Sequence, residues 1–204
     1  MSNISTRIKH QRVIPVVVLE DEASTHGLCQ ALLEGGVSVI EVTLRHAFGV
    51  KALDLIKRNY PDMVTLAGTV NSVADMQAVA AANVDGVISP GLTPALLQSA
   101  QDHGLAYMPG VATGSEVLLA MEFGLRECKL FPASVVGGVA ALKAFSGPFS
   151  DMKFCPTGGV NDANYKDYLA LKNVICVGGS WLAPANLIRE HRWQEITQLC
   201  RAVQ

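Results

Sequence analysis

The chain has 204 residues, half of them hydrophobic and 17% charged, with a formal net charge of −2. This length allows a sizeable buried core, and we expect one domain over residues 1–204. The charge is too small for a large nucleic-acid or anionic-membrane interface, and no apolar run is long enough to span a bilayer.

Short β-rich runs alternate with alanine- and leucine-rich helical runs along the chain. We predict strands at Val13–Leu19, Val39–Leu44, Val64–Thr69, Gly86–Ser89, Ala106–Pro109, Glu127–Phe131, Lys153–Pro156 and Val174–Val177. We predict helices at Ala23–Glu34, Gly49–Asn59, Val73–Ala82, Pro94–His103, Ser115–Phe123, Val139–Phe145, Ala163–Ala170 and near His191–Ala202, with a further short helix at the N-terminus. Eight strands with intervening helices predict an α/β fold, the (β/α)8 TIM barrel.

The competing architecture is a doubly wound open sheet. Its nucleotide fingerprint G-x-G-x-x-G is absent from this sequence, and eight β-α units count against it. Several helical runs end in glycine just before a strand, as at Gly36, Gly104 and Gly124. This weak internal repeat favours the barrel.

Lys129 lies in an apolar segment that is predicted to be an interior strand and that Pro132 closes. A buried ammonium group is costly unless it is paired, and a desolvated lysine can serve as a nucleophilic amine. Side chains alternate along a strand, so Lys129 and Phe131 share one face. If that face is the barrel interior, Lys129 can form a Schiff base with a ketone, or it can merely neutralise a carboxylate.

A carboxylate is available on the second predicted strand. Glu41, Thr43 and Arg45 share one face of this strand, while the apolar residues between them share the other. Chemistry in these barrels occurs at the carboxyl ends of the strands, where Arg45 lies. Glu41 is therefore a candidate general acid/base, and Arg45 a candidate to bind a substrate carboxylate or position Glu41. The alternative is a structural Glu–Arg pair.

The last two predicted strands end in glycine-rich groups. Thr157-Gly158-Gly159 follows the seventh strand and Gly178-Gly179-Ser180 follows the eighth. The loops at these two positions frequently bind phosphate in this fold, because exposed backbone N–H groups converge on the anion. At other strand ends, Thr69 is a candidate carboxylate ligand, and Pro90 is expected to shape the pocket wall.

The cysteines and histidines give no sign of a metal site, because none are clustered at ligand spacing. We expect no metal and no other cofactor. The N-terminal segment is polar and lacks the apolar core of a secretion signal, so we expect a cytoplasmic protein with reduced, buried thiols at Cys29, Cys128, Cys155, Cys176 and Cys200.

Six blocks in order resemble those of the KHG/KDPG aldolase family, the bacterial aldolases for 2-keto-3-deoxy-6-phosphogluconate and 4-hydroxy-2-oxoglutarate. The resemblance extends from Ile14-Pro15-Val16 to Trp181-Leu182. The blocks are Glu41-Val42-Thr43-Leu44-Arg45, Ala67-Gly68-Thr69-Val70, Ile88-Ser89-Pro90-Gly91, Lys129-Leu130-Phe131-Pro132-Ala133, Phe154-Cys155-Pro156-Thr157-Gly158-Gly159 and Gly178-Gly179-Ser180-Trp181.

The resemblance implies a metal-independent class I aldolase, commonly a homotrimer, that cleaves a phosphorylated 2-keto acid in the Entner-Doudoroff pathway. It implies that Lys129 is the Schiff-base lysine and Glu41 the general acid/base. The other implied roles are carboxylate binding by Arg45 and Thr69, walls at Pro90 and Phe131, stereochemical control by Thr157, and phosphate binding by Gly158, Gly159, Gly179 and Ser180.

Three positions depart from the family pattern: His46 replaces a frequent threonine, Leu66 a common glycine, and Ser134 a frequent glutamate. They bear on specificity rather than on the proposed catalytic groups. The sequence also leaves other functions open. These are an aldolase for the galactonate epimer, a phosphosugar isomerase in which Lys129 gives only electrostatic support, and a barrel that binds a phosphometabolite without catalysis.

Overall fold

The computed structural model describes residues 3–8 and 10–204, so Met1, Ser2 and Lys9 of the polar N-terminal segment lie outside the described residues. The strands are β1 (Val13–Val17), β2 (Val39–Thr43), β3 (Val64–Gly68), β4 (Gly86–Ile88), β5 (Tyr107–Met108), β6 (Gly110–Val111), β7 (Glu127–Leu130), β8 (Lys153–Pro156) and β9 (Val177–Gly179). The helices are α1 (Ile4–Arg7), α2 (Glu22–Glu34), α3 (Gly49–Asn59), α4 (Val73–Ala81), α5 (Pro94–Asp102), α6 (Gly114–Glu122), α7 (Gly138–Phe145), α8 (Tyr165–Leu169), α9 (Ala185–Arg189) and α10 (Trp193–Arg201).

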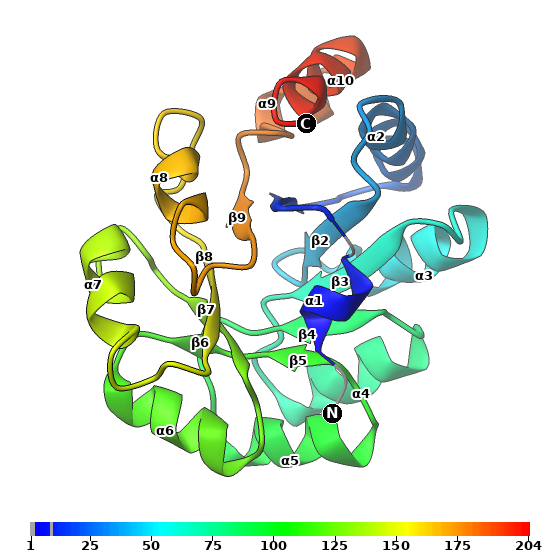
Figure 1. Cartoon of the computed structure of the whole chain (residues 1–204). Helices are drawn as coiled ribbons and strands as arrows, with labels where there is room; N and C mark the ends of the chain where they lie inside the picture. Colours follow the sequence, from blue (N-terminus) through cyan, green and yellow to red (C-terminus); the bar gives the residue numbers. More distant parts are fainter. Residues whose placement is uncertain (1–2, 9) are drawn as a thin grey trace.

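The strands curl into a parallel barrel with helices outside it (Figure 1), which confirms the predicted α/β barrel. Six strands pair in the order β5-β4-β3-β2-β1-β9, and three pair in the order β6-β7-β8. The two sheets meet through isolated parallel bridges from Phe154 to Val174 and from Thr157 to Gly178. At the other junction, β5 and β6 are consecutive segments of the chain.

Six of the eight predicted strands begin at the predicted residue and end at it or one or two residues before it, and the other two, the fifth and the eighth, differ more. The fifth is interrupted at Pro109, which has no N–H to donate, although its carbonyl accepts from the Lys129 N–H at 2.8 Å. Its halves therefore pair separately, β5 with β4 and β6 with β7. The eighth begins at Val177 rather than Val174, because its ladder with β1 starts where Val177 pairs with Val13.

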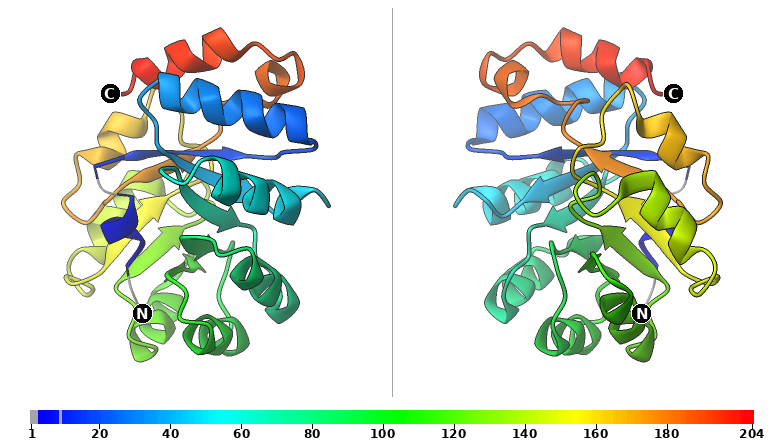
Figure 2. Two further views of the ribbon diagram at one scale, coloured as in Figure 1. Left: turned by 90° about the vertical axis from the view of Figure 1, so that its right-hand side faces the viewer. Right: turned by 90° about the vertical axis from the view of Figure 1, so that its left-hand side faces the viewer.

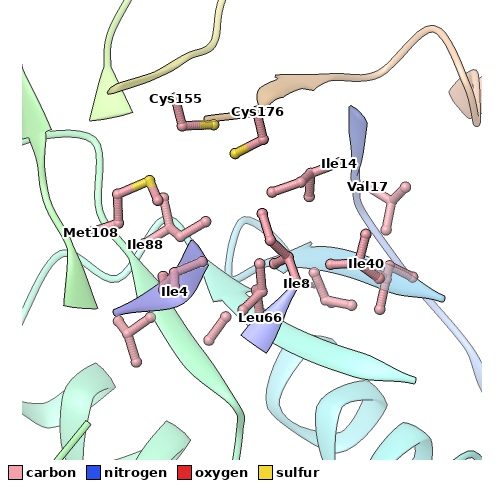
Figure 3. Close-up of a cluster of buried hydrophobic side chains, with 14 of the residues drawn as sticks. Ile4, Ile8, Ile14, Val17, Ile40, Leu66, Ile88, Met108, Cys155 and Cys176 are labelled. Atoms are coloured by element: carbon pink, nitrogen blue, oxygen red, sulfur yellow. The ribbon is translucent and has the colours of Figure 1, made fainter. Parts of the chain in front are cut away.

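The predicted N-terminal helix is α1, which lies over the middle of the ring of strands in Figure 1. Ser5 donates from its N–H to Glu127 Oε2 at 3.1 Å and from its hydroxyl to Glu127 Oε1. Ile4 is 1% exposed, and Figure 3 shows it with Ile8 among buried side chains of the strands. Since Glu127 begins β7, α1 closes the amino-terminal end of the barrel and leaves the carboxyl end for the site.

The outer helices pack mainly against their neighbours in the chain, but α10 lies along α2 (Figure 2) and joins the two ends of the fold. Thr197 Oγ1 donates to the Ala31 carbonyl at 3.0 Å at this contact. The final helix predicted near His191–Ala202 is confirmed as α10 (Trp193–Arg201), but the short helix before it, α9, was not predicted. The two helices are separate because His191 adopts a left-handed conformation (φ 53°) between them.

Candidate active site

A pocket of about 460 Å³ opens at the carboxyl end of the barrel. Residues from β1, β2, β7 and β9 and from the loops after β3, β4, β8 and β9 line it. The structure therefore brings all the predicted site residues together in one cavity. They are Glu41, Arg45, Thr69, Pro90, Lys129, Phe131, Thr157, Gly158, Gly159, Gly179 and Ser180.

The floor of the pocket holds an ion pair. Lys129 Nζ lies 3.1 Å from Glu41 Oε1, and the two side chains are only 7% and 1% exposed. The alternation that was predicted for β2 and β7 explains the geometry, because Glu41 and Lys129 both occupy inward positions of their strands. Their mutual attraction offsets much of the cost of removing both charges from water.

Glu41 fits its place because the neighbouring strand carries no side chain there. Gly68 on β3 is so close that a Cβ on it would lie 2.4 Å from Glu41 Oε1. The second carboxylate oxygen, Oε2, is buried and has no hydrogen-bond partner. A buried carboxylate oxygen without a partner is costly, so this atom is suited to accept from a substrate hydroxyl or a water molecule.

Arg45 does not form the structural pair with Glu41 that was one interpretation of the sequence. Its Nε donates to Thr43 Oγ1 at 3.2 Å, and Thr43 Oγ1 in turn donates to the Val17 carbonyl at 3.0 Å. The guanidinium group thus lines the mouth of the pocket while Lys129 partners Glu41. Thr69 lies beside this mouth with a left-handed backbone (φ 60°), an uncommon conformation for a β-branched residue.

Phe131 and Pro90 form walls, as expected. Lys129 Nζ lies 5.2 Å from the centroid of the Phe131 ring, within the range of a cation–π contact. Pro90 packs on the chain at Gly110, where a Cβ would lie 2.2 Å from the Pro90 carbonyl oxygen. Below it, the Ser89 hydroxyl lies 2.7 Å from the Tyr107 hydroxyl, and burial raises the pKa of Tyr107 to about 12.

The opposite end of the pocket is built from backbone. Gly158 and Gly159 both have left-handed backbones, with φ of 93° and 78°. A side chain on Gly179 would overlap the Trp181 ring, since its Cβ would lie 1.9 Å from a ring carbon. With Ser180, these glycines leave a concave neutral surface, because Arg45 and Lys129 are the only cationic residues lining the cavity among those described.

Buried thiols lie beneath the ion pair. Cys155 pairs in register with Lys129 across β7 and β8, and its thiol contacts that of Cys176 (Figure 3). The contact with the Cys155 thiol is the main cause, and burial the second, that raises the pKa of Cys176 well above its ordinary value. Burial raises the pKa of Cys128 to about 12. All five cysteines are free and buried, as predicted. Within residues 3–8 and 10–204, no cluster of three His, Cys, Asp or Glu side chains is arranged to hold a metal ion.

Several lining residues were not predicted as site residues. Thr43 shares one face of β2 with Glu41, and this alternation was sufficient to predict that Thr43 also lines the pocket. The others form an apolar wall, and two of them belong to α9, a helix that the sequence pattern did not reveal. They are Val16, Val17, Val18, Val160, Ala183, Ala185 and Ile188.

The three departures from the family pattern lie at different depths. His46 is exposed, and its Nδ1 accepts from the Phe48 N–H at 3.2 Å. Leu66 is fully buried in the core. Ser134 is exposed and lies against the glycine loop, where a Cβ on Gly159 would lie 2.2 Å from its hydroxyl oxygen. None of the three lines the pocket.

Comparisons with known proteins identify the family. The family model described as KDPG and KHG aldolase matches residues 4–199. This chain belongs to the KDPG and KHG aldolase family. It is 47% identical to the 2-dehydro-3-deoxy-phosphogluconate aldolase of Dickeya dadantii over 93% of this chain and 89% of that protein. It is 46% identical to the KHG/KDPG aldolase of Escherichia coli K12, with the same coverage of the two chains.

A solved structure extends the similarity to three dimensions. The KDPG aldolase of Legionella pneumophila, captured with pyruvate at low pH as a covalent carbinolamine intermediate, superimposes with a TM-score of 0.96. The two chains are 43% identical, and the match covers 100% of this chain and 98% of the other. Within the described part of the chain, no helix has both the length and the apolar character needed to cross a membrane.

The contact between Gly68 and Glu41 gives a sharp test of the site. We expect Gly68→Ala to displace the Glu41 carboxylate from Lys129 and to lower kcat/KM for aldol cleavage by about 10²-fold, as a misplacement of about 1 Å can do. Steady-state kinetics measure the effect. Gly91→Ala is the matched control, because a Cβ there meets no atom within 4 Å. Equal losses in the two variants would contradict this account.

Proposed function

We propose that this protein is a class I aldolase that cleaves 2-keto-3-deoxy-6-phosphogluconate to pyruvate and glyceraldehyde 3-phosphate. It also cleaves 4-hydroxy-2-oxoglutarate to pyruvate and glyoxylate. The observation that carries this proposal is the buried contact of 3.1 Å between Lys129 Nζ and Glu41 Oε1 at the floor of the pocket. Membership of the aldolase family and the activities for which its relatives are named support the same reaction.

Lys129 supplies the nucleophile. Glu41 Oε1 lies within hydrogen-bond reach of Nζ, so the carboxylate can take the proton that the ammonium group must lose before it attacks. The neutral amine then adds to the C2 ketone of the substrate to give a carbinolamine. Glu41 returns its proton to the departing hydroxyl, so that water leaves, a protonated imine forms and Glu41 is again a carboxylate. Arg45 and Thr69 hold the carboxylate next to this carbon, and Phe131 covers the imine.

The protonated imine withdraws electrons from the bond that breaks. Glu41, directly or through a water molecule, removes the proton of the C4 hydroxyl, and the electrons of the C3–C4 bond move into the imine to leave an enamine. Glyceraldehyde 3-phosphate departs. The enamine is protonated at C3, and water hydrolyses the new imine to release pyruvate and restore the amine of Lys129. Acid–base assistance of this kind contributes about 10²–10⁴-fold in rate.

The distal phosphate is held without a cation. Gly158, Gly159 and Gly179 offer backbone N–H groups, and Ser180 offers a hydroxyl group. Thr157 lies near C4, the carbon that becomes a stereocentre when the aldol bond forms, and it directs the configuration of the C4 hydroxyl group. The galactonate epimer is the alternative substrate, because the same lysine and glutamate would act on it.

We also propose that the protein is a cytoplasmic homotrimer, on the strength of its family membership. Sedimentation equilibrium of the purified protein measures the stoichiometry, and fractionation of the source cells measures the location. A monomer or dimer across the working concentration range, or recovery outside the cytoplasmic fraction, would contradict the corresponding part of this assignment.

Borohydride trapping tests the covalent step. In the presence of pyruvate, borohydride reduces an imine to a stable adduct, and peptide mapping should locate that adduct on Lys129. Lys129→Met should abolish both the adduct and cleavage. Lys51→Met is the control, because Lys51 is exposed and lies on α3 away from the cavity lining. An adduct on another lysine, or catalysis without any adduct as expected of an isomerase, would overturn the assignment.

Ser180 tests the phosphate site. Because the hydroxyl would donate to a charged phosphate, Ser180→Ala should raise KM for 2-keto-3-deoxy-6-phosphogluconate by about tenfold or more and leave kcat nearly unchanged. The same variant should cleave 4-hydroxy-2-oxoglutarate, which has no phosphate, as well as the parent does. Equal increases in KM for both substrates would contradict the proposed site. If the unsubstituted protein has a higher kcat/KM for the galactonate epimer than for 2-keto-3-deoxy-6-phosphogluconate, the epimer is its substrate.

A further inference from the structure

Thr43 is the lining residue whose contacts suggest a role that the proposed reaction does not yet use. It ends β2, it is 1% exposed, and it faces the pocket between Glu41 and Arg45. Its hydroxyl oxygen lies 3.0 Å from the Val17 carbonyl and 3.2 Å from Arg45 Nε. One hydroxyl group therefore joins the end of β1 to the side chain of Arg45.

The direction of these two hydrogen bonds is fixed by chemistry. A carbonyl oxygen can only accept, so Thr43 must donate its single hydroxyl proton to Val17. A guanidinium Nε–H can only donate, so the lone pairs of Thr43 Oγ1 must accept from Arg45. The hydroxyl has no freedom to reverse either bond. It is a fixed acceptor that faces the Nε edge of the guanidinium group.

This anchor matters because Arg45 is otherwise weakly held. Arg45 is exposed, and among residues 3–8 and 10–204 no carboxylate forms an ion pair with it. A long exposed side chain samples many rotamers, and ordering it on binding has an entropic cost. The bond to Thr43 also occupies Nε, which leaves the two terminal amino groups of the guanidinium fork to meet an anion end-on.

We propose that Thr43 is a positioning residue that holds Arg45 in the orientation in which its terminal N–H groups bind the carboxylate of the 2-keto acid. This inference rests on the proposed function, in which Arg45 binds that carboxylate. The backbone around Arg45 strengthens the anchor, because the Leu44 N–H donates to the Gly68 carbonyl at 2.9 Å. β1, β2 and β3 thus jointly set the place of the guanidinium group.

The test measures the pyruvate concentration that gives half-maximal borohydride inactivation. Thr43→Val keeps the side-chain shape but can neither donate nor accept, and it should raise this concentration about 2- to 10-fold, the range expected for the loss of one hydrogen bond that acts on pyruvate only through Arg45. Thr43→Ser keeps the hydroxyl and should stay within about twofold of the parent. If Thr43→Val does not fold, Thr43→Cys replaces it, because a thiol is a weak donor and acceptor.

A double-mutant cycle separates positioning from a structural role. Added to Arg45→Ala, the Thr43→Val change should have no further effect, because the group that Thr43 orients is gone. A similar increase with and without Arg45, or no increase in the single variant, would overturn the proposal. Failure of the proposed function itself would look different, because the parent protein would then form no pyruvate adduct on Lys129.

Discussion

A buried ammonium group and a buried carboxylate lie 3.1 Å apart on the floor of the pocket, and the rest of the site is arranged around them. Neither Lys129 nor Glu41 could be buried alone without a large loss of stability, because an unpaired charge in the interior is among the most destabilising features a protein can carry. Together they place an amine-bearing side chain and a carboxylate within one hydrogen bond of each other, at a place where both side chains are almost fully buried.

The barrel makes this pair possible by removing side chains from the strands beside it. Gly68 leaves the space that the Glu41 carboxylate fills, and Gly178 leaves space for the Thr157 hydroxyl, which a Cβ would approach to 2.5 Å. At the other end of the barrel, α1 packs against Glu127, and the cavity opens toward the carboxyl ends of the strands, where the loops lie. Gly68 and Gly178 therefore leave room for side chains of the pocket, a role that differs from that of the glycines at turns.

Charge is distributed unevenly along the cavity. Among the described residues, Arg45 and Lys129 are the cationic side chains that line the cavity, whereas the glycine-rich part of the lining adds neutral backbone and the hydroxyls of Thr157 and Ser180. In the proposed function, the end of the cavity with Arg45 and Lys129 attracts the carboxylate of the keto acid, and the glycine-rich end selects the rest of the substrate by shape and hydrogen bonding. An arrangement of this kind can accept both a phosphorylated substrate and a shorter one, in agreement with the pair of activities in the name of the Escherichia coli relative.

The sequence was sufficient to predict the barrel, because the alternation of strands and helices is a local pattern, and the predicted site residues all line one cavity of that barrel. A period of two along a strand decides which residues share a face, and it left only the inward or outward direction of the Lys129 face to be found in the structure. Contacts between distant segments were not predictable in this way. The start of β9 depends on its pairing with β1, and the end of α9 depends on a left-handed His191 that no local motif marks. The bond from Arg45 to Thr43 depends on a side-chain rotamer, so the sequence left open a pair with Glu41 instead.

The most direct test of the central claim is a crystal structure of the protein soaked with pyruvate. The account predicts continuous electron density between Lys129 Nζ and C2 of pyruvate, with the pyruvate carboxylate against Arg45 and Thr69 and Glu41 beside the new bond. Pyruvate bound without a covalent link while Lys129 stays paired with Glu41, or attached to a different lysine, would contradict it.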